Sequence, residues 1–463
     1  MGGGNKFIIM KYLLLLLPFF GYSQKTRNII AKDGETINVK VGKGSIKVQI
    51  NGKTVYTQGP QILPPAPPKV LYLKDFSDWR IAFNTAITDS VILQGETMEI
   101  QSDCIPEQHI PFDGNLTLQG TPEKPLVITC NFRDGIDRDT WALYLGNGKK
   151  VFNNVIFRLG TQGAAKWGST VAMGQQGTTF DVTFNNCKWE QGFRYCFNST
   201  QGFGSVSFIN CQLDSYFNNI QLYSQLGAKT LIMNHCTIRT DESHCVYASP
   251  WNNYYINDVV CLGAGKRAFD SRADSIYPFK STFQIFTNCR NAPGAVATDK
   301  GYGLGNAPQW HLWGEGTPSV IVDSCNLAAG SWQGNYTITN SNIYNSGGGT
   351  VIYGTASLNN CTGEITAVNK MNITNSNIQV IAQDGADLTV SNSSISLYNK
   401  FKPSFFKATF SKSNIGEFDL SATNFKIKFD NCNFGNQYKA IRLFGGSKDD
   451  ISFIGNSYPI ATY

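Results

Sequence analysis

The sequence predicts an all-β fold, a single-stranded right-handed parallel β-helix, which is a solenoid of short strands stacked coil upon coil. Two observations predict it. A short motif, an apolar residue two positions before Asn and then Cys or Ser, recurs along the 463 residues. Within the motif, as in VTFNN and LTVSN, apolar and polar residues alternate with the period of a half-buried strand. The spacing of the copies varies, so each coil is expected to add its own loop to a constant strand and turn.

Each copy of the motif ends in a turn residue that is Asn or its equivalent. Asn suits a sharp bend because it tolerates left-handed φ and its side chain bonds nearby backbone. Stacked at one level, these side chains predict an amide ladder, and the Cys or Ser that follows predicts a second, inward row. The turn positions are 154, 186, 210, 235, 258, 288, 324, 340, 360, 375, 392, 412, 431 and 456.

The 12 cysteines mostly occupy the position after the turn residue. Stacked thiols at one level have parallel Cβ vectors, which do not suit a disulfide. We therefore expect buried thiols that act as small apolar residues. A disulfide framework is the alternative in an exported protein.

The N-terminal residues predict export. Lys6 and Lys11 precede an apolar run at 12–20 that is too short to span a bilayer, so residues 1–23 predict a cleaved signal peptide. We expect a secreted, cell-surface or periplasmic protein with no stable membrane insertion after cleavage. With a net charge of +6 and only 16% charged residues, the chain is not expected to bind nucleic acid.

Three segments follow the signal. Residues 25–58 predict a small β segment, residues 59–69 are a Pro-rich linker, and residues 70–463 predict the β-helix. A short amphipathic helix is expected to cap the first coil and cover its unpaired edge. Its apolar positions are Trp79, Ile81, Ala82, Ala86 and Ile87.

The repeated turns resemble those of the right-handed parallel β-helix superfamily, which includes pectate-lyase-like enzymes and phage tail spikes, over residues 75–463. SHCVYAS at 243–249 and YYINDVVCLGAGKRAFDSR at 254–272 are similar to a His-x-x-Tyr coil followed by a Gly-rich turn and an Arg-bearing strand. That pairing occurs in many secreted polysaccharide-acting members, with Gly where this chain has Cys245. The resemblance implies a polysaccharide partner, with a monomer expected for a lyase and a trimer for a spike.

Candidate site residues lie in the middle third. Counting nine residues from successive turn positions aligns Tyr195, Asn219, His244 and Arg267 in one row, which predicts a saccharide groove. Long loops at 263–281 and 290–318 follow this row, and a third, at 160–179, is expected to wall its other side. The substrate-binding candidates in and beside the second loop, whose flat or polar rings suit sugars, are Tyr302, Trp310, His311 and Trp313.

If the polymer contains uronic acids, β-elimination needs a base, a cation on the carboxylate and a proton donor. His244 or Lys266 is the candidate base, Arg267 or Arg272 the carboxylate clamp, and Tyr247 the donor. Asp270 is a further candidate for substrate binding.

Related lyases can use Ca²⁺ for neutralisation, so Ca²⁺ is the one candidate cofactor. The spacing of Asp241, Glu242, Asp270 and Asp274 matches no calcium loop, however. A glycoside hydrolase would need a carboxylate pair, for which Asp270 with Asp241 or Glu315 are the candidates.

Three functions stay open at this point. The first is binding and β-eliminative cleavage of an acidic polysaccharide. The second is a non-catalytic adhesin or tail-spike-like receptor-binding protein, and the third is a structural cell-envelope protein. Fold does not decide among them.

Overall fold

The computed structural model divides the chain into two units, Met1–Lys69 and Val70–Tyr463. It describes residues 25–30, 36–42, 45–50, 53–58, 69–102, 111–132, 140–160, 168–173, 178–190, 192–199, 202–223, 229–249, 252–271, 283–299, 305–313, 319–345, 351–398, 404–422, 424–434, 441–444 and 450–456. The predicted signal peptide and residues 59–68 of the linker lie outside these ranges. No helix among the described residues is long and apolar enough to cross a membrane.

The first unit is a four-stranded antiparallel sheet in which neighbouring strands follow one another in the sequence. The strands are β1 (Lys25–Ile30), β2 (Thr36–Gly42), β3 (Ser45–Ile50) and β4 (Lys53–Gln58).

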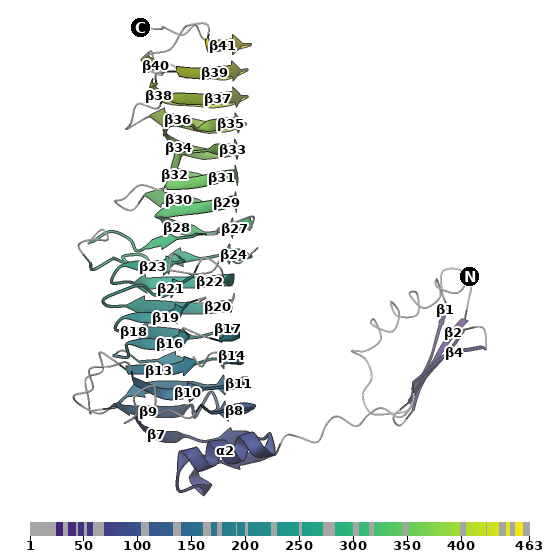
Figure 1. Cartoon of the computed structure of the whole chain (residues 1–463). Coiled ribbons are helices and arrows are strands. Elements are labelled where there is room, and N and C mark those ends of the chain that lie inside the picture. Colours follow the sequence, from purple (N-terminus) through teal and green to yellow (C-terminus); the bar gives the residue numbers. More distant parts are fainter. Residues whose placement is uncertain are drawn as a thin grey trace. The chain divides into compact units, whose positions relative to one another are not determined.

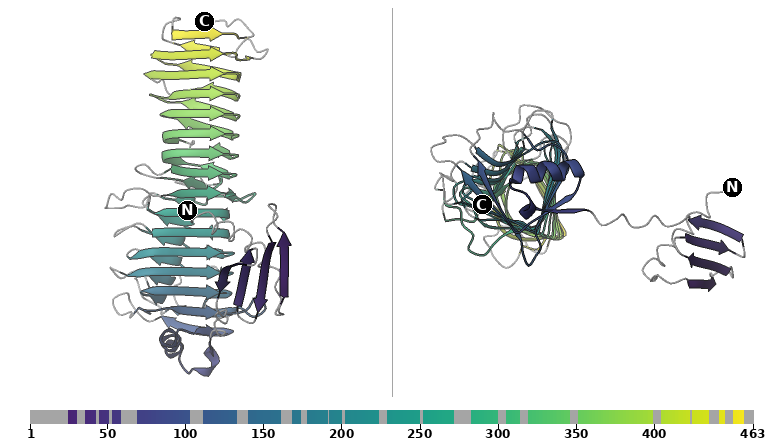
Figure 2. Two further views of the ribbon diagram at one scale, coloured as in Figure 1. Left: turned by 90° about the vertical axis from the view of Figure 1, so that its right-hand side faces the viewer. Right: turned by 90° about the horizontal axis from the view of Figure 1, so that it is seen from below.

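The second unit begins with strand β5 (Val70–Tyr72), which is followed by the short 3₁₀ helix η2 (Leu73–Asp75) and helix α2 (Trp79–Asp89). Asp78 caps α2 by accepting a hydrogen bond from the Arg80 backbone N–H. Phe83 is fully buried and packs on Phe112, with ring centroids 5.2 Å apart. The helix lies across one end of the coils (Figure 2, right), so the expected cap is confirmed. Ile81 does not belong to its buried face, because it is 54% exposed.

The rest of the second unit is an all-β solenoid whose coils stack through parallel strand pairs (Figure 1). Three faces can be followed from coil to coil. The first face, directly before the turn residues, consists of β5 (Val70–Tyr72), β6 (Ile92–Gln94), β8 (Leu116–Gln119), β11 (Gly148–Asn153), β14 (Thr179–Asn185), β17 (Phe203–Ile209), β20 (Lys229–Thr240), β22 (Asn253–Gly263), β24 (Gln284–Thr287), β27 (Ser319–Asp323), β29 (Ser331–Thr339), β31 (Val351–Asn359), β33 (Lys370–Thr374), β35 (Asp387–Ser391), β37 (Phe405–Ser411), β39 (Asn424–Asp430) and β41 (Ile451–Ile454).

The second face follows the turn residues, and β20 and β22 continue into it. Its other strands are β7 (Thr97–Ser102), β9 (Leu126–Phe132), β12 (Val155–Leu159), β15 (Lys188–Trp189), β18 (Gln212–Ser215), β25 (Arg290–Asn291), β28 (Asn326–Ala329), β30 (Asn342–Asn345), β32 (Thr362–Ala367), β34 (Asn377–Ala382), β36 (Ser394–Tyr398) and β38 (Asn414–Ser421).

The third face carries the candidate site. Its strands are β10 (Thr140–Leu145), β13 (Gly168–Met173), β16 (Tyr195–Ser199), β19 (Asn218–Leu222), β21 (Val246–Ala248), β23 (Arg267–Asp270) and β26 (Gln309–His311). Near the C-terminus β40 (Ile441–Phe444) pairs with the end of β38.

The interior is filled by side chains that repeat at one level of successive coils. On the first face Phe152, Phe184 and Phe208 form a stack with centroids 4.8 Å and 5.0 Å apart. These distances match the spacing of parallel strands, because each ring comes from the same position of consecutive coils. The core is therefore continuous along the coils, and it holds the outer faces rigidly in register.

The predicted turn residues are confirmed by the backbone. All of them except 456 have a φ between 48° and 56°, the left-handed conformation that Asn and Asp tolerate best. In the last coil the left-handed residue is Gly455, with φ 64°, so the placement at Asn456 was wrong by one residue. Asn456 lies in the inward row, where its Oδ1 accepts a hydrogen bond from the Cys432 backbone N–H at 2.8 Å.

The amide ladder is present and combines the turn residue with the residue before it. Nδ2 of Asn360 donates to Oδ1 of Asn340 at 2.8 Å. Nδ2 of Asn375 donates instead to Oδ1 of Asn359 at 2.9 Å. The ladder therefore satisfies side-chain amides from coil to coil along the turn edge.

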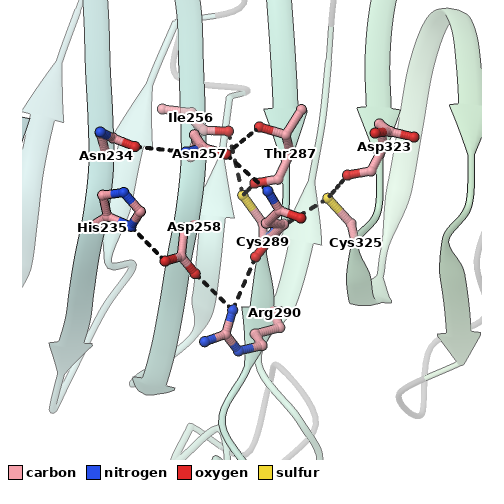
Figure 3. A network of polar contacts seen from close by, with 11 residues as sticks. Asn234, His235, Ile256, Asn257, Asp258, Thr287, Cys289, Arg290, Asp323 and Cys325 are labelled. Atoms are coloured by element: carbon pink, nitrogen blue, oxygen red, sulfur yellow. Dashed lines mark hydrogen bonds and ion pairs between the residues drawn. The ribbon is translucent and has the colours of Figure 1, made fainter.

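Where His235 and Asp258 replace Asn in the ladder, polar contacts between side chains continue it (Figure 3). Nδ1 of His235 lies 2.7 Å from Oδ2 of Asp258, and Nη1 of Arg290 donates to the other carboxylate oxygen at 2.9 Å. Hydrogen bonds from His235 and Arg290 lower the pKa of Asp258. His235 is thus part of the turn edge, as its place in the repeat predicted.

The inward row next to the ladder consists of Cys and Ser. The 11 described cysteines are thiols and all are buried, which confirms the expectation for this part of the chain. Sγ of Cys361 lies 3.4 Å from the carbonyl oxygens of Ile338 and Asn359, so it donates back to the turn. Oγ of Ser376, in the next coil, accepts from the Cys361 backbone N–H at 3.0 Å. Cys and Ser are therefore interchangeable fillers of one position.

Candidate functional site

The third face presents two outward rows of side chains, which we call row A and row B. Between them run core residues, among them Ile220, Val246 and Phe269, so the rows lie on the outer side. Row A is Tyr195, Asn218, His244, Arg267 and Gln309, and row B is Asn198, Gln221, Tyr247, Asp270 and His311. In four successive coils the row A residue interacts with the row B residue of the same coil. We call each such pair a rung, and the two rows together the polar strip.

The central rungs hold the charged groups. Nη1 of Arg267 forms an ion pair and hydrogen bond with Oδ2 of Asp270. The same carboxylate oxygen lies 4.0 Å from Nδ1 of His244 in the neighbouring coil. The side chains of His244, Arg267 and Asp270 are 8%, 11% and 2% exposed. A carboxylate thus lies beside both an imidazole and a guanidinium at low local dielectric, where charges interact strongly.

Tyr247 completes the His244 rung. Its ring stacks on the imidazole with centroids 5.0 Å apart and an interplanar angle of 18°. The ring of Tyr223 packs edge-on against the ring of Tyr247, with centroids 5.8 Å apart. The backbone N–H of His244 donates to Oδ1 of Asn218 at 3.0 Å, which ties the imidazole to the preceding rung. The sequence predicts His244 and Arg267 on adjacent coils, and the structure places them there. It also brings Tyr247 and Asp270 beside them, with Asp270 in β23 and not in the loop expected at 263–281.

The flanking rungs are uncharged amides and an imidazole. Nδ2 of Asn218 donates to Oε1 of Gln221 at 3.3 Å. At the other end, Nε2 of His311 lies 3.0 Å from Oε1 of Gln309. A Cβ on Gly330 would come within 2.0 Å of the His311 ring, so glycine in the next coil makes room for this imidazole.

Asn219 was placed in row A by counting from the turn residue, and this is wrong. Tyr195 pairs with Asn218, because the connection from the turn to the strand is one residue shorter in this coil. Asn219 is fully buried, and its Nδ2 donates to Oγ of Ser215 at 3.0 Å and to the Arg239 carbonyl at 2.8 Å. It belongs to the interior.

Two aromatic residues predicted to bind sugar are buried. Trp310 is fully buried and stacks on Phe269 at 6.1 Å, and its Nε1 donates to Asn291 Oδ1 at 3.0 Å. Alternation along β26 turns it inward while His311 points outward. Tyr195 is in row A as predicted but only 3% exposed, so it is a packing residue of the strip.

The remaining candidates divide into two groups. Trp313 is half-buried and donates from Nε1 to the Ser331 carbonyl at 3.2 Å, at the edge of the strip. Lys266 is half-buried beside Arg267 but in neither row. Arg272 and Tyr302, together with the carboxylates Asp274 and Glu315, lie outside the described residues.

No group of three or more His, Cys, Asp or Glu suited to a metal ion gathers among the described residues. The hydroxyl of Tyr216 hydrogen-bonds to Glu242, and Oδ1 of Asp241 lies 3.6 Å from Nη2 of Arg239. These two carboxylates, whose spacing in the sequence matches no calcium loop, therefore have protein partners. Within the described parts of rows A and B Asp270 is the one carboxylate, so the pair that a hydrolase needs is not found there.

Cys245, which replaces the Gly of the resembled motif, points inward. It is fully buried, and its Sγ lies 4.0 Å from Sγ of Cys261. The substitution therefore leaves the outer surface beside His244 unchanged. Close approach of coils is instead provided by Gly265, where a Cβ would meet the Glu242 backbone at 2.0 Å.

Counting from the turns missed the second row altogether. The signal is present in the sequence as a pair of polar or aromatic residues three positions apart in successive strands. It occurs as Asn218 and Gln221, then His244 and Tyr247, then Arg267 and Asp270. A one-residue bend between the partners, as at Cys245, lets both point outward.

Comparisons with known proteins add little to this geometry. No protein family model matches the sequence, and no curated protein does. Among solved structures, the chain is similar to the catalytic domain of a GH87 α-1,3-glucanase in complex with nigerose. The superposition covers 95% of this chain and 88% of that chain, at 10% identity and a TM-score of 0.29. At that TM-score the likeness supports no argument about activity.

Proposed function

We propose that this chain is a secreted protein that binds an acidic polysaccharide along rows A and B and cleaves it by β-elimination. The observation that carries the proposal is the His244–Asp270–Arg267 cluster on an outer face, within a strip of paired polar side chains. The coils that carry rows A and B repeat about every 4.8 Å, which is close to the length of one sugar ring. An extended glycan parallel to the stacking direction would meet one rung per unit.

The roles follow from the chemistry of each group. His244 is the base that takes the proton next to the uronate carboxylate, and Asp270 stabilises the imidazolium that forms. Arg267 pairs with the substrate carboxylate and stabilises the charge that develops after proton loss. Its ion pair with Asp270 holds the guanidinium beside the imidazole. Tyr247 is the donor to the leaving oxygen.

The export route and the fold family belong to the same proposal. The N-terminal signal supports secretion or display at the cell surface. Parallel coils with left-handed Asn turns support membership of the right-handed pectate-lyase-like superfamily, and right-handed crossover is the usual sense for parallel strands.

Non-catalytic glycan binding is the second candidate, and burial favours it. A base must reach its substrate, and the His244 side chain is only 8% exposed. Electrophoresis in gels that contain acidic or neutral polysaccharides, with reducing ends measured in parallel, separates the candidates. Retardation by an acidic polymer with new reducing ends supports the lyase. Retardation without new ends leaves a binding protein, and no retardation and no new ends contradicts both.

A further inference from the structure

The third face continues N-terminally beyond the charged rungs into a cluster of one cation and two aromatic rings. This cluster, which we call the Arg194 cluster, is Arg194, Tyr195 and Phe217. The guanidinium carbon of Arg194 lies 5.1 Å from the ring centroid of Tyr195 and 5.3 Å from that of Phe217. The two rings meet edge to face, 5.9 Å apart. Both rings therefore hold the cation through cation–π contacts.

Strand register places this cluster on the same strip as the reactive rungs. Tyr195 pairs with Asn218, whose side chain accepts the hydrogen bond from the backbone of His244. Two coil spacings, about 10 Å, therefore separate the level of Tyr195 from the level of His244. Arg194 is directly adjacent to Tyr195 in the chain and half-buried, as is Phe217.

We propose that the Arg194 cluster is a distal subsite that binds the carboxylate of a uronic-acid unit two units away from the unit at His244. The inference rests on the proposed function and deepens it, because it makes the substrate an extended acidic oligosaccharide with repeated carboxylates. The N–H groups of a guanidinium lie in its plane and match a carboxylate in bidentate geometry, while its face stacks on rings. Half-buried Phe217 offers a ring to the sugar, and buried Tyr195 backs the cation.

Row A continues towards the N-terminal coils, beyond the Arg194 cluster, which suits a long ligand. Trp141 pairs with Ser169, which pairs with Tyr195, so Trp141 continues row A. Its ring stacks on Tyr144 with centroids 4.9 Å apart and an interplanar angle of 21°. This repeats the His244–Tyr247 stacking three residues apart, and it places an aromatic pair at the N-terminal end of the strip.

The test compares chain lengths. Oligouronates of about two units are too short to reach the Arg194 cluster from His244, whereas those of about six units or more span both. Both lengths, cut from the polymer that the wild-type chain acts on, are assayed with Arg194→Gln and with the control Arg158→Gln. Arg158 pairs with Glu190 on the second face, so its loss leaves the strip unchanged. Thermal unfolding of both variants checks that they fold.

For Arg194→Gln we expect KM on the long substrates to rise about tenfold or more, the size of a lost charge-assisted hydrogen bond, with kcat unchanged. On the short substrates KM should change little. If KM of Arg194→Gln on the long substrates is unchanged, or if KM rises equally on long and short substrates, the subsite is contradicted. The lyase is still supported in that case as long as the wild type cleaves the polymer. If the wild type binds without cleaving, the same comparison uses Kd. If the wild type neither binds nor cleaves, the proposed function fails and the subsite with it.

Discussion

Oδ2 of Asp270 lies 4.0 Å from Nδ1 of His244, and both side chains are more than nine-tenths buried. The two residues come from adjacent coils and are 26 positions apart in the sequence. Only the parallel stacking of β21 on β23 brings them together, with Tyr247 paired to Asp270. The Asp270 carboxylate therefore has two neighbours, His244 and Arg267, and it forms an ion pair with Arg267.

Replacing Asp270 with Asn should destabilise the fold. It leaves the Arg267 guanidinium charged and buried without its carboxylate, at a cost of about 3–5 kcal/mol in the free energy of unfolding. Urea unfolding measures this directly. The double variant Asp270→Asn/Arg267→Gln removes both charges and should lose less than the single variant. A double variant that is less stable than the single one would contradict the pairing.

Asn218 and Asn219 are both buried, and they should differ in their effect on activity. Asn218→Ala removes the oxygen that accepts from the His244 backbone N–H, so activity should fall about tenfold and the free energy of unfolding by about 1–3 kcal/mol. Asn219→Ala removes a buried side chain that makes interior hydrogen bonds, so stability should fall by about 1–3 kcal/mol with KM unchanged. Steady-state kinetics and urea unfolding of the two variants test this, and the reverse assignment would show that Asn219 is the row A residue.

The turn at Asn360 should tolerate Gly better than Ala. Its φ is 56°, where a Cβ without a local hydrogen bond costs about 1–2 kcal/mol. Asn360→Ala also loses the bond to Asn340. Asn360→Gly loses that bond but relieves the strain, as Gly455 does at the equivalent turn. Thermal unfolding should rank the wild type first, Gly second and Ala last. Equal losses for Gly and Ala would mean that the backbone conformation contributes nothing.

The inward thiols should make the fold sensitive to alkali. Burial raises the pKa of Cys361, so the folded thiol stays protonated at a pH where the unfolded thiol ionises. The unfolded state then binds fewer protons, and the free energy of unfolding falls as pH rises above about 9, by up to about 1.4 kcal/mol per pH unit for each such thiol.

Cys361→Ser isolates this effect, because Ser341 and Ser376 fill the same position in the adjacent coils. Urea unfolding at pH 8 and pH 10 should show a smaller loss for Cys361→Ser than for the wild type. Identical losses in both proteins would exclude Cys361 as a source of alkaline sensitivity.

The repeat predicted the all-β stacked coils and almost every turn, because these follow from local alternation and from the φ preference of Asn. The capping helix was predicted from the helical spacing of apolar residues at 79–87. It also placed His244 and Arg267 on neighbouring coils of one face. The error at Asn219 arose because counting assumes equal connections, and the coil that contains β19 is one residue shorter. The burial of Trp310 depends on strand alternation after a long loop, and nothing local in the sequence sets that phase.

Cleavage by β-elimination with His244 as the base is tested most directly by the ultraviolet absorbance of unsaturated uronate ends. The mature chain is incubated with a panel of acidic polysaccharides, with and without Ca²⁺, beside His244→Ala and the control His235→Ala. His235 belongs to the turn ladder, so that variant should keep its activity. We expect a rising signal for the wild type and the control and none for His244→Ala. A signal that survives in His244→Ala, or no signal from the wild type on any polymer, would contradict it.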